Sequence, residues 1–402
     1  MMNNLKYAIG IDIAKQDFKA CMSVINTNQQ VKVKASRSFE NNPTGFTALR
    51  RWVSKHTKES LPVTYVMEAT GIYYEQLAWF LYQHGCPCSV LLPNHAKGYL
   101  RSIGLKSKND KIDAQGLSRM AAERFLPLWQ PLCRSLYLLR SLTRLHEGLT
   151  RQRTMLNNQL LASDHSMYEL KAVRQGLQAT LKAIDKQIAL TEKQIKQLIA
   201  QDSSLQTKYQ NISRIKGIGL LTFAVVVAET NGFALFDNQA QLVSYAGYDV
   251  VENQSGKRVG KTRISKQGNA RIRRVLHLPA LCVVRYQEPA LKALYERVYQ
   301  RSGIKMKGYV AVQKKLLCLI YALWKKDQPY DPNYYECKQK NEESVTDTSS
   351  NNELELLLPV VFKENRKGAA AAKKVAPTSR ATQDELPCNK SPEALLPVEQ
   401  SY

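Results

Sequence analysis

The sequence has few of the features that a secreted or membrane-bound chain carries. Its eight cysteines are scattered, and only Cys86 and Cys88 lie close together, with no second pair and no histidine partner. Such spacing makes a poor zinc site and indicates reduced structural thiols. The first dozen residues hold no apolar signal core, and the longest apolar run, about 220–228, is far shorter than the ~20 residues that span a bilayer. We therefore expect a soluble, cytoplasmic protein with no membrane partner.

Acidic residues are also scarce. The 402 residues include 58 Lys and Arg against 34 Asp and Glu, which gives a net charge of +24. Positions 341–402 hold 7 basic and 10 acidic residues, so positions 1–340 carry +27. A folded body this basic indicates a polyanionic partner, most commonly nucleic acid, although a solubilising surface charge is the simpler alternative. Hydrophobic residues make up 44%, enough for a globular chain of two or three domains.

Residues 5–125 alternate between short apolar runs and amphipathic segments. The pattern predicts three antiparallel strands, then helix, strand, helix and strand, which is an α/β order with a meander start. Pro43 opens the first helix, since proline loses no hydrogen bond in the first helical turn. The expected strands are Tyr7–Ile13, Phe18–Ile25, Val31–Phe39, Val63–Met67 and Cys88–Leu92, and the expected helices are 42–58 and Gly71–His84.

Glycine is nearly absent from residues 135–205, where Leu, Gln, Lys and Arg dominate. Apolar positions recur there with alternating spacings of four and three, which is typical of a coiled coil or a long helical hairpin. Such a helix can join two protomers, hold two domains apart, or pack within one subunit. The seam consists of Leu177, Leu181, Ile184, Ile188, Thr191, Ile195 and Leu198.

A third block covers residues 211–330. It begins with Ile215–Gly219, which resembles a helix-hairpin-helix turn and continues into the apolar helix Leu220–Glu229. Such a turn offers backbone N–H groups and a helix N-terminus to a phosphate. Residues 341–402 are rich in Asn, Glu, Ser, Ala and Pro and are expected to be a disordered tail. The nucleic-acid contacts predicted at the turn are Lys216, Gly217 and Gly219.

Four carboxylates occupy positions that predict a metal site. Asp12 and Glu68 end apolar strands, while Asp110 and Asp113 are spaced i, i+3 and share a helix face. Each alone has an ordinary structural explanation, as a strand-end turn residue, a first-turn acid or a helix cap. Together they suit Mg²⁺ or Mn²⁺, which prefer oxygen ligands and act on phosphate esters. Three neighbouring lysines suit the phosphate, namely Lys106, Lys108 and Lys111.

The densest basic stretch covers positions 257–274, which contain eight Lys or Arg and no acid. With Gly256, Gly260 and Gly268 it predicts a phosphate-gripping loop that leads into a helix at about Asn269. A solvated basic face is the alternative interpretation. The predicted nucleic-acid contacts are Lys257, Arg258, Lys261, Arg263, Lys266, Arg271, Arg273 and Arg274.

The carboxylate order resembles the RNase H/RuvC-like nuclease fold. Three segments are more specific: Gly10–Lys15, Met67–Gly71 and Lys108–Ala114 resemble the DEDD motifs of the bacterial insertion-sequence transposases called the IS110 ("one-ten") family. The resemblance covers about residues 5–335. It implies an α/β RNase H/RuvC-like N-terminal domain (1–130), a coiled-coil helical linker (131–208), a mainly α C-terminal DNA-binding and catalytic domain (209–335) and the tail (336–402).

The resemblance also assigns a role to Ser255. A Ser-Gly beside basic residues is a weak signal on its own, but in this family the serine at the matching position is the nucleophile that becomes linked to DNA through phosphorus. The family further implies Mg²⁺ bound by the four carboxylates and a composite site that joins the carboxylates of one protomer to the serine of another. A dimer or tetramer on DNA and a structured noncoding bridge RNA are implied in the same way.

Three functions follow for comparison. The first is a DNA transposase or recombinase, nucleoid-associated in a bacterium, that cuts and rejoins donor and target DNA through a covalent serine–DNA intermediate. The second is a RuvC-like structure-specific endonuclease, such as a junction resolvase, in which the carboxylates activate water and Ser255 is a loop residue. The third is a nucleic-acid-binding scaffold with a decayed site, which the four intact carboxylates disfavour.

Overall fold

The structure is a computed structural model that describes residues 3–57, 60–104, 109–168, 171–256, 258–260 and 262–332. The expected disordered tail, 341–402, lies outside these described residues. Within them, no helix combines the length and apolarity that crossing a bilayer requires.

The N-terminal part is built on one five-stranded sheet with the strand order β3-β2-β1-β4-β5. The first three strands form an antiparallel meander, and β4 and β5 continue the sheet parallel to β1. The predicted α/β meander start is therefore confirmed, and β1 becomes the central strand. The strands are β1 (Asn4–Ile13), β2 (Asp17–Asn26), β3 (Val31–Glu40), β4 (Val63–Glu68) and β5 (Cys88–Leu91).

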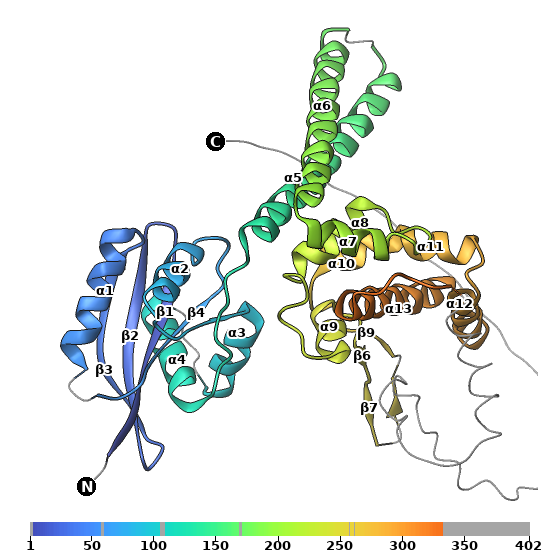
Figure 1. The fold of residues 1–402 in the computed structure, drawn as a ribbon. Coiled ribbons are helices and arrows are strands. Elements are labelled where there is room, and N and C mark those ends of the chain that lie inside the picture. Colours follow the sequence, from blue (N-terminus) through green and yellow to red (C-terminus); the bar gives the residue numbers. More distant parts are fainter. Residues whose placement is uncertain are drawn as a thin grey trace, which may run out of the picture. The chain divides into compact units, whose positions relative to one another are not determined.

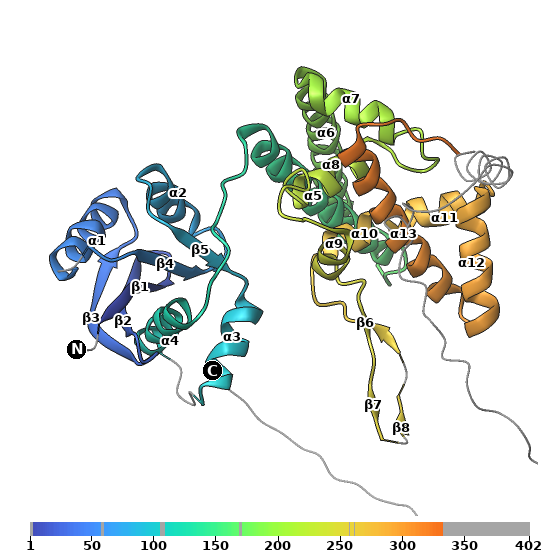
Figure 2. The same cartoon turned by 60° about the horizontal axis from the view of Figure 1, so that its bottom comes forward.

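Two helices cover each face of this sheet (Figure 2). Odd-numbered positions of β1, such as Ile9 and Ile11, are buried in one apolar layer, and the even-numbered Ala8 is buried in the other. This alternation follows from the two-residue repeat of a strand. The Ile9 side carries α1 (Pro43–His56) and α2 (Glu75–Gln83), and the Ala8 side carries α3 (Pro93–Ser102) and α4 (Asp110–Glu123).

Two helix boundaries differ from the sequence-based expectation. No helix was predicted directly after the strand Cys88–Leu92, but Pro93 is the first residue of α3, where its missing N–H costs no hydrogen bond. The second helix was expected from Gly71, yet α2 begins at Glu75. Gly71 has a φ of +57°, a left-handed conformation that belongs to a turn and not to a helix.

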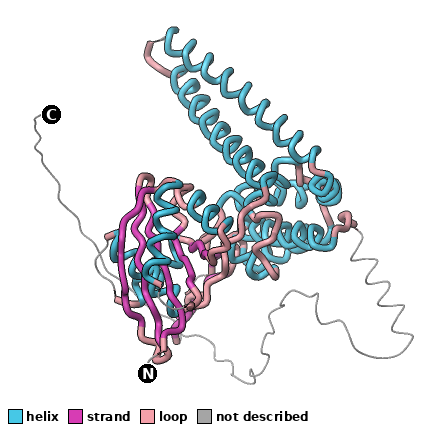
Figure 3. Tube along the Cα trace, turned by 60° about the vertical axis from the view of Figure 1, so that its left-hand side comes forward, coloured by secondary structure: helices cyan, strands magenta, loops and turns pink. Residues whose placement is uncertain are grey.

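Two long helices, α5 (Arg134–Asp164) and α6 (Lys171–Gln201), lie side by side as a hairpin (Figures 1 and 3). The predicted apolar seam of α6 is its least exposed stripe, and Thr191 and Ile195 are fully buried. Each helix of 31 residues extends about 46 Å at 1.5 Å per residue. Since the seam residues towards the hairpin tip are only half-buried, the buried core is confined to the base of the hairpin.

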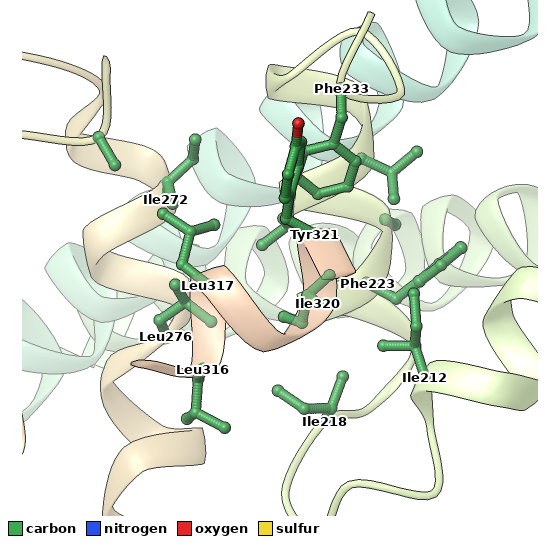
Figure 4. Close-up of a cluster of buried hydrophobic side chains, with 14 of the residues drawn as sticks. Ile212, Ile218, Phe223, Phe233, Ile272, Leu276, Leu316, Leu317, Ile320 and Tyr321 are labelled. Carbon is green, nitrogen blue, oxygen red and sulfur yellow. The ribbon is translucent and has the colours of Figure 1, made fainter. Parts of the chain in front are cut away.

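The C-terminal part is mainly helical, as predicted, and surrounds one apolar core (Figure 4). Phe223, Phe233, Leu316 and Ile320 are fully buried there. A long β-hairpin projects from this helical body (Figure 2). The helices are α7 (Ser203–Ile212), α8 (Leu220–Glu229), α9 (Gln239–Tyr245), α10 (Ala270–Val275), α11 (His277–Arg285), α12 (Pro289–Ser302) and α13 (Lys305–Lys326), and the hairpin strands are β6 (Val250–Val251), β7 (Gln254–Ser255), β8 (Arg258–Val259) and β9 (Arg263–Ile264).

Candidate active site

Asp12 and Glu68 lie next to each other at one edge of the sheet. Their strands pair in parallel, and the last aligned pair is Ile11 with Met67, so the following residues, Asp12 and Glu68, are neighbours on one face. Both are half-buried. Because Glu68 lies two residues after Val66, which packs in the layer beneath α3 and α4, both carboxylates belong to the face that α4 covers.

Gly10 lets α4 lie directly on β1. A Cβ atom at this position would stand 2.1 Å from the backbone N of Ser118 and 2.2 Å from the carbonyl O of Ala114. The helix starts at the carboxyl edge of β1. Its first residue, Asp110, forms an ion pair with Lys19 of β2, which is directly opposite Asp12 of β1. Moving two residues along β1 from Gly10 to Asp12, about 7 Å, corresponds to four or five residues of helix. Asp12 therefore lies level with the first turn of α4.

That first turn contains Asp110 and Asp113. Asn109 caps the helix, with its side-chain oxygen accepting from the backbone N of Ile112 at 2.8 Å. The cap fixes Asp110 as the first helical residue and Asp113 on the same face. Asp113 is half-buried, while the Asp110 side chain is 68% exposed. The fold thus gathers the four predicted carboxylate positions at one edge of the sheet.

The donor set at this edge consists of carboxylate oxygens, which suits Mg²⁺ or Mn²⁺. In the part of the chain that the structure describes, however, no three His, Cys, Asp or Glu side chains form a group ready to hold a metal ion. Placement on the fold and donor chemistry fit a divalent ion, and the side chains have to close around it.

Lys19 is a site residue that the sequence analysis did not identify. It is aligned with Asp12 across β1 and β2, and its Nζ lies 2.9 Å from Asp110 Oδ2. The signal was present in the sequence, since Lys19 follows the tight connection after β1. Identifying Lys19 requires the register of β1 and β2, because only that register shows that Lys19 is opposite Asp12. Of the three lysines predicted near the carboxylates, Lys111 is exposed on α4, and Lys106 and Lys108 lie outside the described residues.

Ser255 lies on a β-hairpin, at the start of the stretch in which the sequence predicted a phosphate-gripping loop and no strands. Its strand, β7, pairs with β8, with Ser255 opposite Arg258. Gly256 follows with a φ of +55°, which glycine adopts without steric cost and which closes the tight turn. Ser255 is exposed close to the tip of the hairpin, so its hydroxyl is open to a large substrate.

Exposed basic side chains follow the same hairpin. Arg258, Arg263 and Lys266 are all exposed, while Lys257 and Lys261 lie outside the described residues. At the base of the hairpin, Arg273 donates to the carbonyl oxygens of Ala246 at 2.8 Å and Lys266 at 3.2 Å. Arg273 therefore holds the two arms of the hairpin together, which is a structural role in addition to the predicted contact with nucleic acid.

Arg271 and Arg274 pair with acidic side chains of the protein. Arg271 Nε lies 2.8 Å from Glu147 Oε2 and 3.9 Å from Glu229 Oε1, and Arg274 also forms an ion pair with Glu147. Arg151 of α5 contacts the same Glu147 at 2.7 Å. This cluster joins α5 to α10, and no local pattern indicates it, because Glu147 is more than 120 positions from Arg271 and Arg274.

Glu229 is a buried carboxylate at the end of α8, with a side chain that is only 2% exposed. Arg144 donates to both of its oxygens, at 2.8 and 3.0 Å, and Asn269 Nδ2 donates at 2.8 Å. Burial by itself raises the pKa of Glu229, but the hydrogen bonds from Arg144 and Asn269 and the nearby positive charges outweigh it and hold that pKa below its usual value. Glu229 therefore stays ionised and connects α5, α8 and the start of α10.

The Ile215–Gly219 turn joins α7 and α8, as the sequence suggested. Gly217 has a φ of +89°, and a Cβ there would stand 2.8 Å from Cys282 Cβ, so this glycine is needed for packing against α11. Lys216 Nζ lies 3.6 Å from Glu288 Oε1. Gly219 precedes the first residue of α8, is exposed, and has nothing within 4 Å of the place that a Cβ atom would take.

Two family models match the chain. A model for the DEDD domain of IS110-type elements, described as "Transposase", matches residues 9–163. A second, described as "Transposase IS116/IS110/IS902 family", matches residues 209–296. Between them they contain all five predicted catalytic residues.

Curated relatives match over most of their length. The chain is 30% identical over 332 residues to the pilin gene-inverting protein of Moraxella bovis, which covers 82% of this chain and 99% of that protein. It is 24% identical over 353 residues to the transposase for insertion sequence element IS1111A of Coxiella burnetii, covering 80% of this chain and 90% of the relative. Among solved structures, Thermus thermophilus RuvC in complex with a Holliday junction substrate matches 29% of this chain and 93% of its own, with 12% identity and a TM-score of 0.22.

Proposed function

The chain belongs to the IS110 family of transposases, and from this premise we propose that it cuts and rejoins DNA with Ser255 as the nucleophile and with Asp12, Glu68, Asp110 and Asp113 as metal ligands. The observation that carries the proposal is the placement of Ser255 on an exposed basic hairpin, apart in sequence from a sheet edge that holds four carboxylates. Neither element is sufficient by itself, since a serine hydroxyl needs activation and carboxylates alone supply no covalent link.

The domain division that goes with this function follows the sequence. Residues 1–130 form the metal-dependent RuvC-like domain, 131–208 the coiled-coil linker, 209–335 the transposase domain and 336–402 the tail. The paired helices α5 and α6, of 31 residues each, support a linker of this kind, because the predicted seam is the least exposed stripe of α6.

The chemical step is a transfer of phosphorus from one oxygen to another. Ser255 Oγ forms a bond to phosphorus while one P–O ester bond of the strand breaks, and the proton of the hydroxyl passes to the departing deoxyribose oxygen. Rejoining reverses the step with a hydroxyl of another strand. A bound divalent ion would stabilise charge on the attacked phosphate. Arg258 lies opposite Ser255 in the hairpin and holds the phosphate beside it through charge-assisted hydrogen bonds.

DNA is the partner that the family assignment supports, and the charge of +27 on residues 1–340 suits it. We include a structured noncoding RNA and a second copy of the chain as further partners. The distal part of the α5–α6 hairpin supports a second copy, because Met155, Leu161 and Val173 are at least half exposed there, and apolar side chains on a helix pair favour helix association. Light scattering in the presence of DNA and RNA tests this directly, and a monomer under those conditions contradicts the composite site.

The serine is tested by trapping the covalent intermediate. The full-length protein is incubated with Mg²⁺, cognate RNA and labelled DNA, denatured, and examined for protein-linked DNA. We expect an adduct that disappears in Ser255→Ala and persists in Thr262→Ala, which removes a hydroxyl from the opposite arm of the hairpin. If Ser255→Ala still cuts and joins normally, the serine is not the nucleophile.

The metal site is tested separately with Asp12→Asn. This variant keeps the shape of the side chain and should lose DNA cleavage while its circular dichroism spectrum is unchanged. Retained cleavage in Asp12→Asn contradicts the metal role. Cleavage by Ser255→Ala without any adduct, together with loss of cleavage in Asp12→Asn, would instead support the endonuclease that activates water. No cleavage by the wild type with any divalent metal would support the scaffold.

A further inference from the structure

Lys19 occupies a position beside the carboxylate edge that the family assignment does not explain. In the antiparallel pair of β1 and β2, Lys19 is directly opposite Asp12. Residues directly opposite each other in such a pair project from the same face of the sheet. Since Asp12 faces α4, Lys19 faces it as well, and its side chain lies next to the start of that helix.

The ammonium group of Lys19 makes a specific contact there. Nζ donates to Asp110 Oδ2 at 2.9 Å, across 91 positions of sequence. The contact joins β2 to the first turn of α4 at a solvent-exposed edge, with 35% of the Lys19 side chain and 68% of the Asp110 side chain accessible. Asp110 is thus oriented by a positive charge that the protein itself supplies.

Charge balance explains why a lysine belongs at this point. Four carboxylates at one sheet edge repel each other unless a cation lies among them. The hydrogen bond to Asp110 raises the pKa of Lys19, with further contributions from the negative charges of Asp110, Asp17 and Asp12, so the lysine is charged across the physiological range. The Lys19 ammonium offsets part of the repulsion, and in the described residues the carboxylates do not close into a metal-binding group.

We propose that Lys19 is the resident counter-ion of the carboxylate site, which holds Asp110 in the metal-free protein and gives it up when a divalent cation binds. This inference rests on the proposed metal role of Asp110. In the exchange, the Nζ–Oδ2 hydrogen bond breaks, Lys19 keeps its proton and turns to solvent, and Asp110 turns towards Asp12 and Glu68. No covalent bond is made or broken.

The exchange makes Lys19 a competitor of the metal. Every cation that binds has to break the Lys19–Asp110 pair and then tolerate a unit positive charge nearby. Lys19 therefore lowers the affinity of the metal-free protein for divalent ions. A purely structural lysine would stabilise the fold without changing that affinity, so metal binding distinguishes the two roles.

The test measures Mn²⁺ binding to the full-length protein without DNA, by titration calorimetry and by the electron paramagnetic resonance signal of free Mn²⁺. Lys19→Met should bind Mn²⁺ about tenfold more tightly than the wild type, as expected when a unit charge is removed from about 6 Å of a divalent ion in a water-like dielectric. Lys19→Arg keeps the charge and the hydrogen bond to Asp110 and should stay near the wild-type affinity.

Lys32→Met is the matched control. Lys32 is an exposed lysine of β3, aligned with Val24 near the opposite end of the same sheet. Its removal lowers the net charge equally, so it should leave Mn²⁺ affinity near that of the wild type. Should Lys19→Met fail to fold by circular dichroism, Lys19→Gln retains a polar side chain without the charge and replaces it.

Equal or weaker Mn²⁺ binding by folded Lys19→Met, or by folded Lys19→Gln where it replaces Lys19→Met, overturns the counter-ion role. If Asp110→Asn leaves Mn²⁺ binding unchanged, both the counter-ion role of Lys19 and the metal role of Asp110 are overturned. Neither result affects the covalent adduct of Ser255, which is measured with DNA and RNA, so failure of this inference and failure of the serine mechanism are distinguishable.

Discussion

Arg144 of α5 donates two hydrogen bonds to the buried carboxylate of Glu229 of α8, at 2.8 and 3.0 Å. Glu229 in turn accepts from Asn269, the residue that caps α10. Tyr245, at the end of α9, donates to the backbone oxygen of Glu229 at 3.0 Å. Since α9 and α10 flank the hairpin that carries Ser255, one buried acid anchors both ends of that hairpin and ties them to the long helix α5.

The first prediction concerns the stability of this anchor. Arg144→Met removes the two hydrogen bonds and leaves a buried carboxylate with reduced compensation, so it should lower the free energy of unfolding by about 3 kcal/mol. Denaturant unfolding followed by circular dichroism measures the change. Arg151→Met is the control on the same helix: its side chain is 60% exposed, and its loss should cost at most about 1 kcal/mol. Equal effects of the two variants contradict the anchor.

The pH dependence of stability provides a second test. The folded pKa of Glu229 is lowered, so its contribution to stability is fully present above the unfolded pKa of about 4.3 and is lost as pH falls through the folded value. Glu229→Gln removes this titration. The stability advantage of the wild type over Glu229→Gln should therefore be largest near pH 7 and shrink below about pH 4.3. A difference that stays constant from pH 7 to pH 3 contradicts the ionised state of Glu229.

The third prediction concerns Glu147 and nucleic acid. This acid pairs with Arg271 and Arg274, two residues predicted to contact DNA. Glu147→Gln should release both guanidinium groups from Glu147 and tighten binding to duplex DNA several-fold at about 50 mM salt, with a smaller gain at about 200 mM. Fluorescence anisotropy of a labelled duplex measures both. Glu192→Gln neutralises an exposed acid on the neighbouring helix α6, and it should have the smaller effect.

Gly10 provides the fourth prediction. Because a Cβ would stand 2.1 Å from a backbone atom of α4, Gly10→Ala must displace the helix that carries Asp110 and Asp113. We expect a loss of about 1–3 kcal/mol of stability, as for other overpacked sites, together with weaker Mn²⁺ binding. Gly98→Ala adds the same methyl group on α3, where nothing lies within 4 Å, and should be neutral or stabilising. If Gly10→Ala binds Mn²⁺ as tightly as the wild type, the position of α4 does not determine metal binding and this prediction is contradicted.

The two glycines of the α7–α8 turn yield the fifth prediction. Gly217→Ala meets Cys282 and a left-handed φ, so it should destabilise the fold by about 1–3 kcal/mol. Gly219→Ala meets open space and should leave the melting temperature nearly unchanged while weakening DNA binding, because the added methyl group stands where a phosphate approaches the N-terminus of α8. Thermal unfolding and DNA anisotropy are measured on both variants. We expect Gly217→Ala to lower the melting temperature and Gly219→Ala to weaken DNA binding alone, and the same result for both variants contradicts the separate roles of the two glycines.

The sequence by itself determined the elements and the chemistry of the N-terminal part. Short apolar runs located all five strands of the sheet within a few residues, and strand ends marked Asp12 and Glu68. These signals are local, since they depend on the residues of one strand and on the i, i+3 spacing within one helical turn. The DEDD motifs were equally local, which is why the family could be identified from short segments.

Only the tertiary structure decided which of these residues meet. The Lys19–Asp110 pair depends on the register of β1 and β2 and on the close approach of α4 at Gly10. The hydrogen bonds to Glu229 depend on the packing of α5 against α8. A phosphate-gripping loop was predicted beside Ser255, and the pairing of β7 with β8 placed this serine on a hairpin. Contacts between distant positions arise from packing and pairing that no local pattern encodes, so the sequence could name the carboxylates but not the cation that balances them.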